Sequence, residues 1–224
     1  MRTAKPALAC RGAQRPDLNE RGFTLIEFMI AAALTAIVLG STVMLATQIQ
    51  QAYGTQLDDA TVEQEARYAL EWIARDLRSA GSDPYSIIPP EQEVWLYPNG
   101  GADCDASISG QQGDSIRVQA DINPPDGDIL DPLENVTIAF DAANNVITRQ
   151  DSNDPDDATA VAMTEAIITD LCFTHLNSAR AATADSKVVA YVQVQVTAQS
   201  RGRNLYTGEF TRSTLATEVR LRTR

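Results

Sequence analysis

The feature that most constrains this chain is a long stretch without charge near its N-terminus. No charged residue lies between Phe28 and Leu57, and positions 23–46 are apolar or small almost throughout apart from one acid. A helix rises about 1.5 Å per residue, so this stretch is long enough to cross a hydrocarbon core of about 30 Å. Residues 1–22 carry a net charge of +3. Because basic flanks stay on the cytoplasmic side, we expect a single membrane helix with a cytoplasmic N-terminus.

Two other N-terminal signals fit this segment less well. A cleavable secretory signal has an apolar region of about 7–15 residues followed by a small-x-small site, and this apolar run is longer and has no such site at its end. The run Ala7–Cys10 is similar to a lipoprotein cleavage site, but its apolar stretch is only a few residues long. The sequence therefore favours a helix that stays attached to the rest of the chain.

One carboxylate, Glu27, interrupts the apolar run. An unpaired carboxylate inside a membrane helix costs several kcal/mol, and such residues are functional candidates by default. The alternative is that Glu27 lies close to the lipid headgroups and reaches water. The neighbouring residues favour the functional interpretation.

The segment Arg21–Ile30 reads Arg-Gly-Phe-Thr-Leu-Ile-Glu-Phe-Met-Ile. It resembles the processing site of type IV prepilins, in which a glycine is followed by Phe-Thr-Leu-Ile-Glu and an apolar helix. The resemblance implies that prepilin peptidase removes residues 1–22 by cleaving after Gly22 and methylates the new amine of Phe23. Glu27 then supplies the counter-charge for that amine in a medium of low dielectric. The retained helix is expected to pack with those of other pilins in a filament.

Beyond the membrane segment, helical spacing continues to about residue 80. Apolar residues recur at intervals of three and four, which marks one buried stripe: Ala66, Leu70, Ile73, Leu77 and Ala80. Gly81 and the pair Asp83-Pro84 are expected to end the helix. We interpret Tyr68 and Trp72 as packing residues. The predicted helix spans residues 23–80, with 23–49 as its transmembrane and assembly part.

The segment Glu65–Gly81 contains the run Ala-Arg-Tyr-Ala-Leu-Glu followed by Ala-Arg-Asp-Leu-Arg. It resembles PilW-type minor pilins in particular. The J-type pseudopilins of type II secretion share a looser form of this helix and are the alternative family.

Residues 81–224 show mainly strand and turn signals and form the predicted head. Apolar and polar residues alternate along Lys187–Gln199 and Phe210–Arg222, and Asn144-Asn145 marks a hairpin between two shorter strands. One apolar face per strand indicates an antiparallel sheet covered on one side. The predicted fold class is α+β and pilin-like, with a long N-terminal helix packed on an antiparallel sheet.

The chain contains three cysteines, and Cys10 would leave with the leader. The remaining pair, Cys104 and Cys172, suggests a disulfide in an oxidising compartment. Two separate buried thiols are the alternative, because Cys172 lies in an apolar strand.

An acidic stretch between residues 121 and 134 places oxygen ligands around a glycine. Calcium takes six to eight oxygens, and alternating acidic positions provide them in EF-hand loops. The candidate calcium ligands are Asp121, Asn123, Asp126, Asp128, Asp131 and Glu134. A solvated, turn-rich loop is the alternative for this stretch, and it is the favoured interpretation of a second acidic run, Asp151–Asp157.

The sequence points to a structural subunit rather than an enzyme. It has one histidine, no nucleophile elbow and no phosphate-binding loop. The net charge of −15 over residues 23–224 disfavours direct nucleic-acid binding. We expect a minor pilin of a type IV pilus, first held in the inner membrane and then placed outside it. A type II secretion pseudopilin and a membrane-tethered adhesin are the alternatives.

Overall fold

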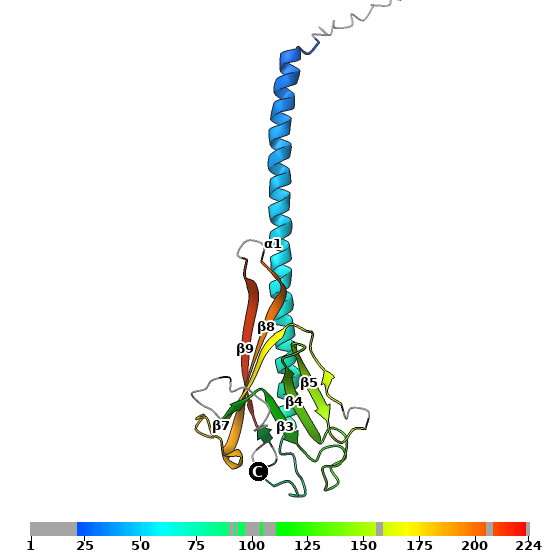
Figure 1. The fold of residues 1–224 in the computed structure, drawn as a ribbon, viewed down its shortest axis with the longest axis vertical. Coiled ribbons are helices and arrows are strands. Elements are labelled where there is room, and N and C mark those ends of the chain that lie inside the picture. Colours follow the sequence, from blue (N-terminus) through cyan, green and yellow to red (C-terminus); the bar gives the residue numbers. More distant parts are fainter. Residues whose placement is uncertain are drawn as a thin grey trace, which may run out of the picture. The chain divides into compact units, whose positions relative to one another are not determined.

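The structure is a computed structural model, and it describes residues 22–89, 92, 94–96, 104, 111–155, 159–204 and 208–222. The chain divides into two compact units, Met1–Ile49 and Gln50–Arg224. A single long helix, α1 (Leu25–Ser79), contains residues of both units (Figure 1). The predicted leader lies outside the described residues except for Gly22.

In the first unit, every side chain of α1 is exposed, and the helix is long and apolar enough to span a membrane. The part from Leu25 to Ile49 is about 37 Å long. Its hydroxyl groups donate to carbonyls one turn back on the same helix, as Thr35 Oγ1 does to Ala31 O at 2.7 Å and Ser41 Oγ to Val38 O at 2.8 Å. These bonds satisfy the hydroxyl donors within the helix itself, which is what an apolar solvent requires.

In the second unit, α1 buries the predicted apolar stripe. Ala66, Ile73 and Leu77 are fully buried, and Leu70 and Ala80 are nearly so. Trp72 is 5% exposed, which confirms its interpretation as a packing residue, whereas Tyr68 is 48% exposed and that interpretation of it was wrong. Tyr68 follows the stripe residue Ala66 by two positions, about 200° around the helix, so its side chain leaves the core.

The helix ends close to the predicted stop. Ala80 N donates to Leu77 O at 3.2 Å, a tightened last turn, and Gly81 then takes a φ of 72°. Left-handed backbone is open to glycine without steric cost. Gly81 N donates to Gln119 O at 3.1 Å, which ties the end of the helix to a strand of the head.

The head contains two antiparallel sheets instead of the single one predicted. The five-stranded sheet has the order β1-β3-β4-β5-β6, and its strands are β1 (Val94–Leu96), β3 (Ser115–Gln119), β4 (Asn135–Asp141), β5 (Val146–Asp151) and β6 (Val161–Ala162). The four-stranded sheet has the order β2-β7-β8-β9, and its strands are β2 (Gln112–Gly113), β7 (Ile168–Asn177), β8 (Val189–Arg203) and β9 (Phe210–Arg220). A short 3₁₀ turn, η2 (Ser186–Val188), precedes β8.

One core cluster joins α1 to both sheets. Ile73 and Leu77 of α1 belong to the same buried cluster as Ile138 of the five-stranded sheet and Phe173 of the four-stranded sheet. The buried side of α1 is wider than the predicted stripe, because Ala69, Trp72 and Ala74 are also buried, and it begins one turn earlier, at Val62. This width explains how one helix covers two sheets. The predicted strands are confirmed. β4 and β5 form the predicted hairpin, in which Asp141 pairs with Val146 next to the turn.

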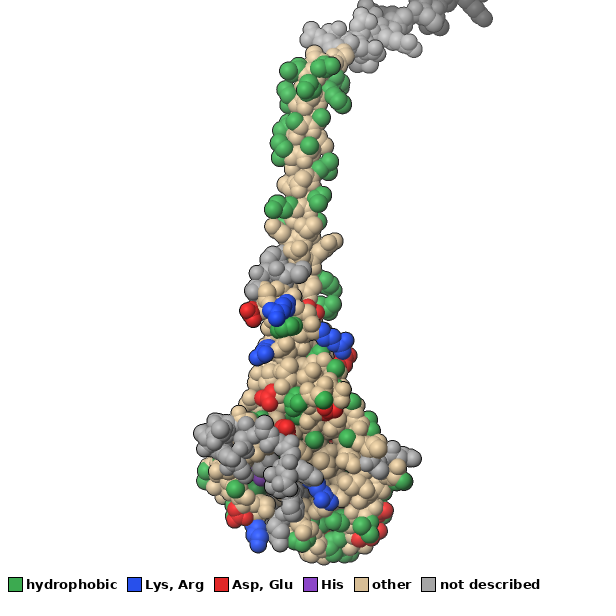
Figure 2. Space-filling model, viewed as in Figure 1, with side chains coloured by type: hydrophobic (Ala, Val, Ile, Leu, Met, Phe, Trp, Pro, Cys, Tyr) green, Lys and Arg blue, Asp and Glu red, His purple; other side chains and the backbone are tan. Residues whose placement is uncertain are grey.

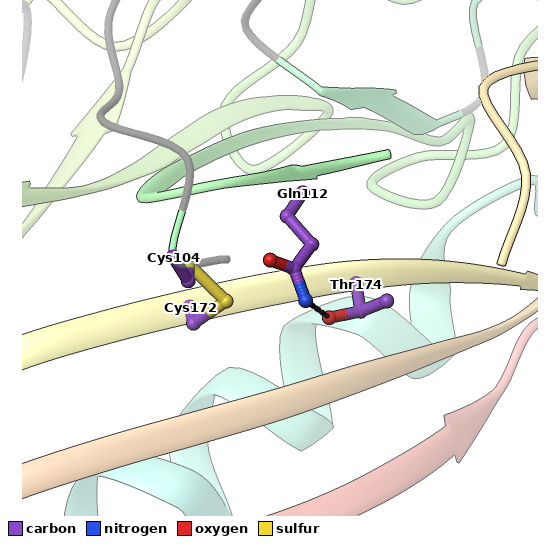
Figure 3. The surroundings of a disulfide bond; sticks show 4 residues. All are labelled: Cys104, Gln112, Cys172 and Thr174. Carbon is purple, nitrogen blue, oxygen red and sulfur yellow. Dashed lines mark hydrogen bonds between the residues drawn. A yellow bond between two sulfur atoms is a disulfide. The ribbon is translucent and has the colours of Figure 1, made fainter. Parts of the chain in front are cut away.

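The predicted disulfide is present between Cys104 and Cys172, whose Cα atoms are 5.9 Å apart (Figure 3). Cys172 lies on β7, so the bond attaches the segment before β2 to the middle of the four-stranded sheet. Beside it, Gln112 Nε2 donates to Thr174 Oγ1 at 2.9 Å. Both links hold the short strand β2 at the edge of β7.

Candidate functional site

The start of α1 exposes the predicted processing site. Phe23 is 92% exposed, and nothing lies within 4 Å of the position that a side chain on Gly22 would occupy. Both residues precede the first helical residue, Leu25. The backbone at Gly22 is therefore open to close approach by a protease.

Glu27 forms a capping box with Thr24. Glu27 Oε2 accepts from both the backbone N and the Oγ1 of Thr24 at 2.9 Å, and Glu27 N donates to Thr24 Oγ1 at 3.3 Å. Phe28 N donates to Thr24 O at 3.1 Å, the first bond of the helix. Thr24 is thus the N-cap residue and Glu27 the third helical position of the Ser/Thr-x-x-Glu pattern. The prediction for Glu27 did not include this role of Thr24, although the Thr-x-x-Glu spacing is its sequence signal.

The capping box leaves one oxygen of Glu27 available. Both bonds from Thr24 end on Oε2, and among the described residues none donates to Oε1. An ionised carboxylate accepts about four hydrogen bonds. A cationic amine on Phe23 and the capping box can therefore share the same carboxylate. Along the apolar part of α1 beyond it, Figure 2 shows hydrophobic side chains and no charged ones on the face in view.

A family model for the prokaryotic N-terminal methylation motif matches residues 17–43, which include this whole arrangement. The motif supports a type IV prepilin-like protein. The motif indicates processing of the prepilin-like chain by prepilin peptidase and points to a structural pilin. Comparison with curated proteins and with solved structures gave no significant match.

In the acidic loop, five of the six predicted calcium ligands fall into two groups, and the sixth, Asn123, is exposed. Asp126, Asp128 and Asp131 each offer a carboxylate oxygen, and these oxygens lie within 4.8 Å of one another at the surface. Desolvation raises the pKa of Asp131, and the carboxylates of Asp126 and Glu134 raise it further. This repulsion between carboxylates is what a divalent cation would relieve.

The other group of predicted ligands forms the internal framework of the loop. Asp121 is 1% exposed and accepts from the backbone N of Asp126 and Gly127 at 3.1 and 3.2 Å. Glu134 is 0% exposed, and its Oε1 accepts from Asn123 N at 3.0 Å and from Ile122 N at 2.8 Å. These two carboxylates replace water for backbone donors that a turn would otherwise leave unpaired. The calcium site stays a prediction.

The buried carboxylate of Asp151 supports the same loop from β5. It accepts from the backbone N of Leu133 and, at 3.1 Å, from Asn153 N. Asn153 Nδ2 donates to Asp131 O at 2.9 Å. Asp151 and Asn153, at the start of the second acidic run, therefore hold the loop of residues 121–134 by hydrogen bonds. The prediction of a solvated loop did not include this role.

Proposed function

We propose that this prepilin-like chain is a PilW-type minor pilin, built into a type IV pilus or priming its assembly. In this proposal residues 1–22 are the leader, residues 23–80 form the helix with 23–49 as its membrane and assembly part, and residues 81–224 form the exported head. The N-terminus lies in the cytoplasm before export. The observation that carries the proposal is the capped, wholly exposed apolar start of α1 directly after Gly22.

The proposed chemistry at this site has two steps. Prepilin peptidase hydrolyses the peptide bond after Gly22, which frees the amine of Phe23. The same enzyme transfers a methyl group to that amine from a sulfonium methyl donor, which leaves as a thioether, and the amine loses one proton. The amine stays cationic, so it needs a counter-charge wherever water is excluded. Glu27 is one helical turn away and provides it, on the same subunit or on its neighbour. The exposed apolar surface of residues 25–49 then packs against other pilin helices.

The variant Glu27→Gln tests this role. Cleavage is expected to continue, because Gly22 and Phe23 are unchanged, whereas incorporation into sheared filaments is expected to fall strongly because the amine loses its partner. Glu63→Gln is the matched control, since Glu63 lies on the same helix but forms an exposed pair with Arg67 in the second unit. Normal incorporation of Glu27→Gln would contradict the proposal.

The second candidate is a J-type pseudopilin of a type II secretion machine, which uses the same processing site and a similar helix. Residues 65–81 favour the PilW-type assignment by resemblance. Co-purification decides between the two candidates: the pilus assignment predicts that the chain follows sheared pili, and the pseudopilin assignment predicts that it follows the secretion platform.

A further inference from the structure

Strand β9 is the one long strand with an open edge among the strands that the structure describes. The four-stranded sheet ends at β9, and no described strand pairs with its far side (Figure 1). β9 has 11 residues, whereas the other three sheet edges are formed by β1 with 3 residues and by β2 and β6 with 2 each. Short edge strands are a common protection against unwanted pairing. β9 lacks that protection.

The hydrogen-bonding direction along β9 can be read from its two ends. Leu221 N donates to Ala190 O at 3.0 Å, and Thr211 N donates to Ser200 Oγ at 3.1 Å, both towards β8. Because the direction alternates along an antiparallel strand, the backbone groups that point away from β8 belong to Arg212, Thr214, Ala216, Glu218 and Arg220. The register with β8 is continuous from Arg212 to Arg220. The strand contains no proline.

A groove runs between this open edge and α1. It has a volume of about 490 Å³, and its walls include Leu70, Ala74 and Arg78 of α1 together with Leu215, Ala216 and Thr217 of β9. Three consecutive residues of β9 have side chains on both faces of the sheet, so the groove lies at the edge of the strand. A strand added about 4.8 Å from β9 would cover this groove and bury alternate side chains against Leu70 and Ala74.

Arginines lie at both ends of the exposed face of β9, whereas the α1 wall of the groove carries both signs of charge, with Glu71 beside Arg67 and Arg78. Arg212 and Arg220 are exposed on β9 and Arg78 is exposed on α1, and among the described residues no carboxylate pairs with any of the three. The acid on the same face of β9, Glu218, is already paired with Arg180 at 3.1 Å. The chain after the leader carries a net charge of −15, so this edge is an exception within an acidic protein.

We propose that the open edge of β9 binds an extended segment of a partner protein as an added antiparallel strand. The segment has alternating apolar side chains that fill the groove over Leu70 and Ala74, and carboxylates opposite Arg212 and Arg220. Main-chain hydrogen bonds give the affinity, and the groove and arginines give the specificity. Dimerisation of the chain through β9 in micelles, abolished by Ala216→Pro, would identify a second copy as the occupant and would overturn the proposal.

A designed peptide tests the proposal on the purified full chain in detergent micelles. The probe has nine residues, matching the span Arg212–Arg220, with capped ends, a terminal aspartate at each end, and valine alternating with threonine between them. Fluorescence anisotropy of the labelled probe is expected to show binding, and the affinity is expected to fall as the salt concentration rises. A probe with lysine in place of both aspartates is expected to bind at least about tenfold more weakly, since it meets the arginines with like charge.

The variant Ala216→Pro removes an outward N–H and leaves the bonds to β8 in place, because proline is tolerated on the open side of an edge strand. It is expected to lower the affinity for the aspartate probe at least about tenfold, while Ala216→Thr keeps it. If Ala216→Pro changes the melting temperature, Arg212→Glu with Arg220→Glu provides the second test and should reverse the preference between the two probes. Absence of binding, or equal binding of both probes by all variants, overturns the proposal. Peptide binding does not depend on processing or filament assembly, so it fails or succeeds separately from the proposed function.

Discussion

His175 gives the sharpest quantitative prediction, because it is the single histidine of the chain and lies in the core of the head. It is 2% exposed on β7, and burial lowers its pKa from the ordinary 6.5 to about 4. Its Nε2 atom has no hydrogen-bond partner among the residues that the structure describes. The folded head therefore holds this imidazole in the neutral form down to a pH at which the unfolded chain has already protonated it.

The sign of the effect follows from which state binds the proton. Between pH 6.5 and 4 the unfolded chain binds one proton at this position and the folded chain does not, so stability falls as pH falls through that range. With these two pKa values, the loss between pH 7 and pH 5 is about 2 kcal/mol. Asp114 and Asp170 have pKa values raised by burial, and they therefore act in the opposite direction.

The assay compares urea denaturation of the full chain in detergent at pH 7 and pH 5, with tryptophan fluorescence as the measure of unfolding. His175→Gln is expected to remove about 2 kcal/mol of the pH-dependent loss, whatever its effect at pH 7, because both aspartates remain. Gln193→His is the control, since Gln193 is exposed on the neighbouring strand β8 and an exposed histidine should add no comparable pH dependence. An unchanged pH dependence in His175→Gln would refute the reasoning.

Three further predictions concern the disulfide, the acidic loop and the helix cap. The disulfide closes a loop between residues 68 apart, and reducing it is expected to lower the free energy of unfolding by about 4 kcal/mol in the chain-entropy model; a denaturation midpoint unaffected by reductant would contradict this. Calcium is expected to raise the melting temperature relative to chelator, and Asp126→Asn with Asp128→Asn to abolish the difference; identical melting curves for the parent chain would exclude the site. Thr24→Ala is expected to destabilise the first turn of α1 by about 1 kcal/mol, whereas Thr24→Ser is expected to preserve it. Amide exchange at residues 25–27 in detergent should therefore be faster in Thr24→Ala than in Thr24→Ser. Equal exchange in both variants would argue against the capping box.

Local features of the fold were predictable because they depend on spacing along the chain. The buried stripe of α1 follows from the helical period, and the stop at Gly81 from the left-handed backbone that glycine allows. Strands β8 and β9 were visible because apolar side chains alternate along them. The Thr24–Glu27 capping box was also predictable, since the pattern is local. The charge of Glu27 had been interpreted only as a counter-charge for assembly.

The division into two sheets was not predictable from the same signals. Alternation identifies a strand and its buried face, but it does not identify the neighbouring strand, which is set by packing between distant segments. The acidic loop shows the same limit. Asp121 and Asp126 are both aspartates of one loop, yet the first is buried against backbone donors and the second is exposed. The three-dimensional structure is needed to tell a carboxylate that binds backbone donors from one that is free to bind a metal ion.

The most direct test of the central claim is the N-terminus of the mature protein. Intact-mass analysis with N-terminal fragmentation of the chain from the producing cell is expected to give a polypeptide that begins with N-methylated Phe23 and retains the whole apolar part of α1. A mature chain that still carries residues 1–22, or one that has lost residues 23–49, would contradict the account.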